Sequence, residues 1–274
     1  MGILFCRPHE SNSLIKNFYY RMFGVPHIGT RLRGRAVFSL FPATRPLKIL
    51  EIGCGVGYFS YELAKRGHHV TSLDSFTGIS RRDVDNIRTI FRKGGMKFHF
   101  VEGKATKLPF KRKSFDAIFI IDVIEHVPDE NKALKEIYRV LKPDGFFIAS
   151  TPAIGFHRGK FKRFFRFLHD STFLKNLPVW DDMQLQPESH MKHEGHLREY
   201  SLEKWRKLCK VHHFHLETWE EEYRFFGALL VELYHVFRFV DRYGNFLFSF
   251  LYPLTFLDAF IPVKGTGIAI RACK

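Results

Sequence analysis

Three glycines at alternate positions, Gly53, Gly55 and Gly57, follow a short apolar run and precede a helical pattern. Glycine adopts positive φ angles readily and lets a ligand approach the bare peptide. The first turn of the following helix has backbone N–H groups without intrahelical partners, which can bind a polar ligand. The spacing G-x-G-x-G differs from the G-x-G-x-x-G of dinucleotide sites, because Tyr58 replaces the last glycine. These residues predict a cofactor site other than a dinucleotide site.

Asp74 follows a second expected strand, at residues 69–73. A carboxylate at a strand end, beside a glycine turn, can accept hydrogen bonds from both hydroxyls of a nucleoside ribose. The alternative is a surface aspartate that precedes a helix. The position at the strand end favours the ribose role, so the turn and Asp74 together predict a site for a cofactor that contains a nucleoside.

Alternating strand and helix patterns surround these residues. Strands are expected at 48–52, 69–73, 97–102, 115–121 and 146–150, and helices at 58–66, 80–92 and 131–141. The run at 115–121 is apolar on both faces, which is typical of a central parallel strand. The alternation predicts an α/β fold with a doubly wound, mostly parallel sheet. In such sheets ligands bind at the carboxyl ends of the strands.

A set of short motifs occurs in a characteristic order over about residues 47–150. The motifs are LEIGCGVG at 50–57, Asp74, LPF at 108–110, SFDA at 114–117, VIEHVP at 123–128 and LKPDG at 141–145. This set resembles the class I S-adenosylmethionine-dependent methyltransferases, and most of all the branch of the ubiquinone and menaquinone methylases. The resemblance implies a Rossmann-like sheet of seven strands whose last strand is antiparallel. The final pair is then expected at 215–223 and 266–272, after a helix at 201–210.

The resemblance implies S-adenosyl-L-methionine as the cofactor. The methionine side would lie over the glycine turn, the ribose on Asp74 and the adenosine beside Ser75 and Phe76, while Asp122 would face the amino group of the donor. The cofactor-binding residues expected in this way are Glu51, Gly53, Cys54, Gly55, Gly57, Asp74, Ser75, Phe76, Ala105, Asp122 and Val123.

One position departs from the family pattern. Where the family has Gly-Asp-Ala after the third strand, this chain has Gly103, Lys104 and Ala105. A lysine ammonium cannot accept the hydrogen bond that the aspartate accepts from the adenine amino group. We expect a weaker donor affinity, with backbone groups of Ala105 still available to adenine.

Two histidines are candidate catalytic residues. Methyl transfer requires alignment of the acceptor with the donor methyl and exclusion of water, and imidazole suits a general base near neutral pH. His126 follows the fourth expected strand, and His196 lies in a His-x-Arg-x-Tyr-Ser segment that resembles one placed over the acceptor pocket in this branch. The alternatives are a capping or packing role for His126 and a structural role for His196. A metal site formed by His190, His193 and His196 with Glu194 is disfavoured, because Gly195 interrupts the spacing, and we expect no metal.

The composition is strongly basic and rich in phenylalanine. The chain has 43 Lys and Arg against 28 Asp and Glu, a formal charge of +15, and 31 Phe. A basic surface favours anionic partners. The phenylalanine excess favours lipid over nucleic acid, because nucleic-acid sites need only a few stacking rings. We expect that an anionic membrane surface can be a partner of this protein. We do not expect nucleic acid as a partner.

The cysteines and the N-terminus bear on location. The four cysteines form no C-x-x-C pair, which argues against a zinc knuckle or a disulfide framework and favours a reducing compartment. Residues 7–10 interrupt the apolar pattern that a signal peptide requires. We expect a cytoplasmic protein that can associate peripherally with a membrane.

The expected organisation has four parts. They are an N-terminal lid or edge region at 1–46, the S-adenosylmethionine-binding core at 47–152, a basic aromatic insertion at 153–195, and the C-terminal part of the core at 196–274, with an apolar helical insertion at 225–263. The two insertions predict either membrane contact or a closed cap over the site. The longest charge-free run, at 243–257, is shorter than the ~20 residues that span a bilayer.

The expected function is S-adenosylmethionine-dependent methyl transfer to a small amphipathic or lipid-linked acceptor, with oxygen favoured as the acceptor atom, at or near a membrane surface. The first alternative is a soluble small-molecule methyltransferase with a closed aromatic cap. The second is an inactive binding protein with a methyltransferase fold, which Lys104 alone supports. The sequence does not specify an oligomeric state.

Overall fold

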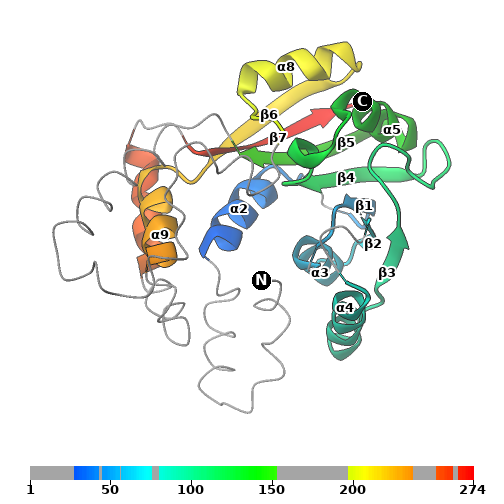
Figure 1. Cartoon of the computed structure of the whole chain (residues 1–274), viewed down its shortest axis with the longest axis horizontal. Coiled ribbons are helices and arrows are strands. Elements are labelled where there is room, and N and C mark those ends of the chain that lie inside the picture. Colours follow the sequence, from blue (N-terminus) through cyan, green and yellow to red (C-terminus); the bar gives the residue numbers. More distant parts are fainter. Residues whose placement is uncertain are drawn as a thin grey trace.

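A single mixed sheet organises the part of the chain that the computed structural model describes, which is residues 28–42, 45–55, 57–75, 80–152, 197–236, 251–261 and 265–274. The strand order is β3-β2-β1-β4-β5-β7-β6 (Figure 1). The strands are β1 Lys48–Ile52, β2 His69–Asp74, β3 His99–Glu102, β4 Phe115–Ile121, β5 Leu141–Pro152, β6 His215–Glu222 and β7 Gly267–Cys273. The strands from β3 to β5 pair in parallel, and β7 is antiparallel to both β5 and β6. This arrangement confirms the predicted fold class.

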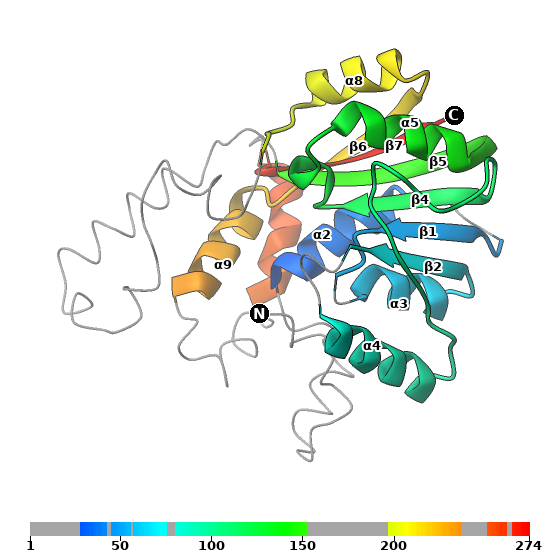
Figure 2. The same ribbon diagram turned by 45° about the vertical axis from the view of Figure 1, so that its right-hand side comes forward.

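Helices cover both faces of the sheet (Figure 2). They are α2 Ile28–Ser39, α3 Tyr58–Lys65, α4 Arg81–Lys93, α5 Glu130–Val140, α8 Leu202–Val211 and α9 Phe225–Val236, with the 3₁₀ helices η1 Ile124–His126 and η4 Tyr252–Phe260. On one face Ile118 and Ile120 of β4 pack with Leu134 of α5 and Trp205 of α8. On the other face β4 packs against α2 and α3. The strand is apolar on both faces because both are covered.

Polar caps mark several helix starts that the sequence predicts. Ser80 and Asp83 form a reciprocal capping box at α4. Ser201 accepts from the N–H of Lys204 at the start of α8 without a reciprocal bond, as expected with lysine at that position. The observed bounds lie within two residues of the predicted ones for these helices and for β1 to β4.

The segment 141–145 differs from its prediction. The sequence predicts that the strand begins at residue 146, but β5 begins at Leu141, directly after α5. Phe115 pairs with Leu141 and Ala117 pairs with Phe146, so the intervening residues form an irregular bulge in β5. Asp144 has a φ of 58° at this point. A bulge places an extra stretch of chain opposite its partner strand without ending the pairing.

The structure describes only portions of the predicted N-terminal region and of the predicted insertion at 225–263. Residues 153–195 lie outside the described residues, as do residues 1–27, so neither the basic insertion nor most of the N-terminal region is described. Within the predicted insertion at 225–263, α9 and η4 pack against each other, and α2 packs against α9 and β6 (Figure 1). No helix among the described residues is both long enough and apolar enough to cross a membrane.

Candidate functional site

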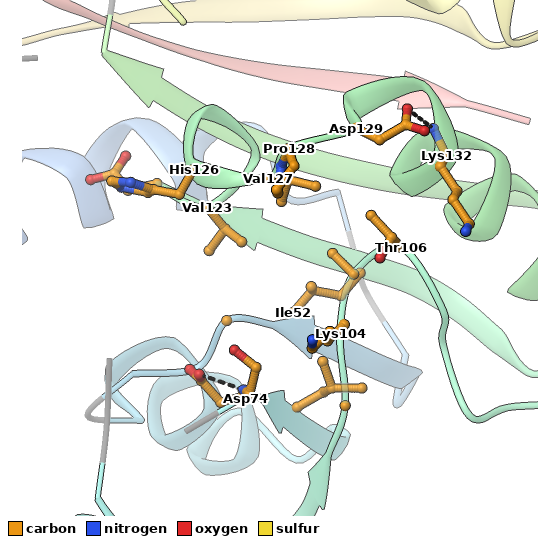
Figure 3. Close-up of a pocket in the computed structure, with 16 residues that line it drawn as sticks. Ile52, Asp74, Lys104, Thr106, Val123, His126, Val127, Pro128, Asp129 and Lys132 are labelled. Carbon is orange, nitrogen blue, oxygen red and sulfur yellow. Dashed lines mark hydrogen bonds between the residues drawn. The ribbon is translucent and has the colours of Figure 1, made fainter. Parts of the chain in front are cut away.

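A cavity of about 910 Å³ opens at the carboxyl ends of β1, β2, β3 and β4 (Figure 3). This is the edge at which a doubly wound sheet is expected to bind ligands. Its volume lies toward the upper end of the ~300–1,000 Å³ usual for ligand pockets. The lining residues are Ile52, Gly53, Leu73, Asp74, Ser75, Gly103, Lys104, Ala105, Thr106, Asp122, Val123, His126, Val127, Pro128, Asp129 and Lys132.

The glycine turn after β1 borders the cavity through Gly53, whereas Gly55 and Gly57 are not among the lining residues. Gly53 and Gly55 have φ angles of 73° and 48°, in the left-handed region. A Cβ on Gly53 would overlap the side chain of Val123, so glycine lets the turn approach the end of β4. A Cβ on Gly55 would meet nothing within 4 Å. Gly55 therefore leaves a backbone surface that a ligand can approach.

Asp74 connects the turn to the end of β2. Its Oδ2 accepts from the N–H of Gly55 at 2.9 Å and its Oδ1 accepts from the N–H of Ser75 at 2.7 Å. Each carboxylate oxygen retains a second lone pair. Asp74 and Ser75 both line the cavity (Figure 3). The side chain thus holds the turn and can still accept from ligand hydroxyls.

The side chains of Glu51 and Cys54 lie beneath the turn and are absent from the cavity lining. Glu51 is buried and accepts a hydrogen bond from Ser60. Burial raises the pKa of Glu51 to about 8, against the opposing effect of that hydrogen bond. Cys54 packs with Val84 of α4. These predicted cofactor-binding residues are placed to support the backbone of the turn, and Gly57 likewise packs close to Ile87.

The opposite wall comes from the loop after β3. Lys104 is exposed and lines the cavity together with buried Ala105 (Figure 3). The N–H of Gly103 donates to the carbonyl of Asp74 at 2.9 Å, which holds this loop against the end of β2. Lys104 therefore lies at the end of the cavity that contains Asp74, the residue predicted to bind the ribose. Phe76 lies outside the described residues.

Asp122, directly after β4, belongs to a network that extends away from the cavity. It has a φ of 52°, and its Oδ2 lies 2.5 Å from Nη2 of Arg33 on α2. The Ser150 hydroxyl lies 3.1 Å from Asp122 Oδ1 and 2.6 Å from Glu222 Oε1. A hydroxyl has one proton to donate, so both contacts are hydrogen bonds only if one carboxyl group is protonated.

Burial favours the protonated form of two carboxyl groups near Asp122, those of Glu222 and Glu125. It raises the pKa of Glu222 to about 8, with Arg33 opposing the change and Asp122 adding to it. Burial also raises the pKa of Glu125 to about 8, again with a contribution from Asp122. The Glu125 carboxyl is fully buried and makes no hydrogen bond among the described residues. Burial opposes the charge of Arg33, but Asp122, Tyr223 and Glu222 outweigh it and raise its pKa.

We define Arg33, Asp122, Glu125 and Glu222 as the carboxylate network. Of these four residues, only Asp122 is a site residue predicted from the sequence. Arg33 lies in a basic segment and Glu222 in an acidic one, and neither has a local pattern that distinguishes it from its neighbours. Contacts between α2, β4 and β6 bring them together, so only the tertiary structure could find them.

His126 ends η1 and lines the cavity beside Val123 (Figure 3). The backbone N–H of His126 donates to the backbone carbonyl of Val123 at 2.9 Å. His196 lies outside the described residues, but the N–H of Leu197, the next residue, donates to the carbonyl of Glu125 at 2.8 Å. The segment that begins at Leu197 thus packs on the loop that contains His126.

No group of three or more His, Cys, Asp or Glu within the described ranges could hold a metal ion. His190, His193, His196 and Glu194 lie outside those ranges. The expectation that they form no metal site stays a prediction.

Residues 50–149 match the family model described as a methyltransferase domain. The chain is 39% identical over 104 residues to a sterol 24-C-methyltransferase of Gibberella zeae, a match that covers 37% of this chain and 26% of the relative. It is 40% identical over 106 residues to a ubiquinone/menaquinone biosynthesis C-methyltransferase of Rhodopseudomonas palustris, covering 38% of this chain and 41% of the relative. The matches therefore span well under half of these relatives.

Two solved structures have a similar fold. The [4+2]-cyclase SpnF aligns with a TM-score of 0.56 and 18% identity, over 89% of this chain and 80% of its own. An S-adenosylmethionine-dependent methyltransferase of Thermotoga maritima aligns with a TM-score of 0.52 and 20% identity, over the full length of both chains. At these identities the likeness concerns the fold, and the cyclase demonstrates that one fold serves more than one reaction.

Proposed function

We propose that this chain, whose central domain is a class I S-adenosylmethionine-dependent methyltransferase domain, transfers the methyl group of that cofactor to an apolar or amphipathic acceptor. The observation that supports the proposal most is the pairing of Asp74 with the open backbone at Gly55. It provides a carboxylate for ribose hydroxyls and a bare peptide surface for the rest of the donor, at the expected edge of the sheet.

The donor would occupy the half of the cavity between the glycine turn and the loop after β3. Asp74 would accept from the ribose, and backbone groups at Ala105 would meet adenine. S-adenosyl-L-methionine supplies a methyl group on a sulfonium, which is electrophilic without further activation. The task of the protein is then to align the two reactants and exclude water.

The acceptor would enter the other half of the cavity, past Val123 toward His126 and Val127. This half contains the apolar side chains of Val123, Val127 and Pro128 and the imidazole of His126, and Asp129 and Lys132 line it farther along. His126 is our candidate for removing the acceptor proton, with His196 as the second candidate from the sequence. The carboxylate network adjoins the same half through Asp122 and can share a proton that arrives at that carboxylate.

The chemical class of the acceptor is inferred from the composition and the relatives. The chain has 31 Phe, and the two relatives are named for a sterol and for quinone biosynthesis. An apolar, lipid-like acceptor is consistent with both. From the sequence we favour transfer to oxygen, whereas both relatives are named as C-methyltransferases. A carbon-13 methyl label distinguishes these outcomes, because methyl groups on carbon, nitrogen and oxygen differ in NMR shift.

Calorimetric titration of the full chain with S-adenosylmethionine and with its demethylated product tests the donor site. We expect both to bind, and we expect Asp74→Ala to weaken binding by at least about ten-fold, because hydrogen bonds from two ribose hydroxyls are lost. Asp85→Ala is the matched control, since Asp85 is an exposed carboxylate on α4. Equal binding by the Asp74→Ala variant would exclude the ribose role.

A binding protein without methyltransferase activity is the second candidate, and the position of Lys104 in the cavity is the observation that favours it. A folded parent protein that binds neither form of the donor would support this candidate over the enzyme. Donor binding without transfer to any apolar hydroxylated acceptor would favour the soluble, capped enzyme that acts on a different small molecule.

A further inference from the structure

The 3₁₀ helix η4 exposes four large apolar side chains within nine residues. The exposed fractions are 39% for Leu254, 57% for Phe256, 45% for Leu257 and 83% for Phe260. Single exposed apolar residues are common on soluble proteins, but a contiguous group marks an interaction surface. We call these four residues the η4 face.

Arginines border the η4 face. The Arg31 guanidinium lies 4.0 Å from the centre of the Tyr252 ring, and that of Arg35 lies 5.2 Å from the centre of the Phe256 ring. Arg35 also donates to the Thr255 hydroxyl at 3.2 Å. Both arginines come from α2, which contains no acidic residue. The apolar surface is therefore accompanied by positive charge.

The acidic residue of η4 does not offset this charge at the surface. Asp258 is 3% exposed. Its carboxylate accepts from the N–H groups of Phe226 and Gly227 at 2.7 and 3.0 Å, at the start of α9. Asp258 thus binds the two helices together, and the side chains that η4 presents outward are apolar.

The η4 face is connected to the candidate site through α2. Arg31 and Arg35 are four positions apart and share one side of this helix. Arg33, between them, points to the other side and pairs with Asp122 at the cavity. One helix thus contacts η4 with one side and the candidate site with the other.

We infer that the η4 face docks on an anionic lipid bilayer surface. Exposed Phe and Leu side chains beside arginines match an interface in which acyl chains lie under anionic headgroups. A formal charge of +15 adds attraction at longer range. The inference rests on the proposed function in one respect, namely that a lipid-like acceptor would enter the cavity from the bilayer on which this face docks.

Flotation of the full chain with lipid vesicles tests the docking. We expect binding to vesicles of mixed phosphatidylcholine and phosphatidylserine at low salt, weaker binding at high salt, and little binding to phosphatidylcholine alone. A double variant with Phe256→Ser and Phe260→Ser should lose most of the binding. The single variant Phe260→Ser, which alters an 83% exposed side chain, should weaken binding several-fold without affecting folding.

Charge variants and a control variant complete the test. Arg31→Gln and Arg35→Gln should each reduce binding to anionic vesicles roughly five-fold, in line with about 1 kcal/mol per basic residue near an anionic surface. Trp219→Ser is the control, because Trp219 is 42% exposed on edge strand β6, beside Arg206 and not η4. It should bind vesicles as the parent does.

The outcomes separate the docking from the proposed function. Parent protein that does not float with anionic vesicles at low salt overturns the docking, as does unchanged binding by the double variant. Concentration-dependent self-association that Phe260→Ser abolishes would also overturn it and assign the η4 face to a second copy of the chain. Calorimetry with the demethylated donor is independent of lipid, so vesicle binding without donor binding would reject the proposed function alone.

Discussion

At the scale of the single residue, Asp74 has a structural task and a proposed binding task. Its carboxylate accepts from the backbone of Gly55 and from that of Ser75. Two fixed N–H donors hold the carboxylate in one orientation before a ligand arrives. A pre-oriented acceptor loses less conformational freedom on binding, which favours affinity.

Lys104 leads to a prediction at the same scale. Lys104→Asp should strengthen donor binding by roughly five-fold, because a carboxylate can accept from the adenine amino group and a typical hydrogen bond contributes about 1 kcal/mol. Calorimetry with S-adenosylmethionine measures the change. Lys107→Asp is the control, since Lys107 is an exposed neighbour absent from the cavity lining. Equal affinity for the parent and Lys104→Asp would mean that this position does not meet adenine.

At the scale of the element, the turn between β1 and α3 depends on glycine for two different reasons. At Gly53 the space is filled, because the Val123 side chain lies where a Cβ would go. At Gly55 the space is open. The first glycine allows two strand ends to pack closely, and the second leaves room for a ligand.

This difference predicts that Gly53→Ala and Gly55→Ala behave differently. Gly53→Ala should lower the free energy of unfolding by about 2–4 kcal/mol, from a positive φ combined with overpacking. Gly55→Ala should lower the free energy of unfolding by about 1 kcal/mol, from the positive φ alone. It should reduce the free energy of donor binding by much more than that amount. Urea unfolding and calorimetry measure the two effects. A Gly55→Ala variant that binds the donor normally would place the ligand elsewhere.

At the scale of the whole molecule, the carboxylate network joins elements distant in sequence. Arg33 comes from α2, Asp122 follows β4, Glu125 lies in η1 and Glu222 in β6. The Ser150 hydroxyl of β5 contacts both Asp122 and Glu222. Glu222 is buried, whereas the side chains of Arg33 and Asp122 are about a quarter exposed, and removal of Arg33 would leave the buried Glu222 carboxyl without its cationic partner. The network therefore makes α2 part of the candidate site.

Glu222 gives a pH-dependent prediction for the whole molecule. Its pKa in the folded protein, about 8, lies above the ordinary value of 4.5, so between these values the folded state binds more protons than the unfolded state. The free energy of unfolding should then fall as pH rises from about 5 to 8, by up to about 1.4 kcal/mol per pH unit for one fully titrating group. Glu222→Gln, which cannot ionise, should lack this contribution.

Urea unfolding of the parent and the variant across that pH range measures the difference. The comparison is needed because burial lowers the pKa of His68 and of His212, which makes stability rise with pH and opposes the effect. Glu220→Gln is the control, a partly exposed carboxylate on the same strand that pairs with Arg224 and not with Arg33. Parallel pH curves for the parent and Glu222→Gln would show that Glu222 is ionised in the folded protein across this range.

Local pattern was sufficient for most of the elements and for one half of the site. The apolar run of β4, the cap at Ser80 and the glycines after β1 are short-range signals, because each depends on residues close in sequence. The bulge at 141–145 was missed because its conformation depends on pairing with β4. The start of β5 at Leu141 cannot be predicted from strand propensity alone, because the strand continues through Pro143 and Gly145, which disfavour strands.

By itself, the periodicity of the sequence predicted the doubly wound fold and the position of Asp74 at a strand end, and the resemblance of its ordered motifs to a methyltransferase family implied the cofactor class. Only the tertiary structure placed Glu51 and Cys54 beneath the turn and assembled Arg33, Glu125 and Glu222 around Asp122. The physical reason is that burial and charge pairing depend on which distant segments pack together. The same packing, of α2 against α9 and against η4 through Arg31 and Arg35, decided which apolar side chains of the C-terminal segment are covered and which face outward.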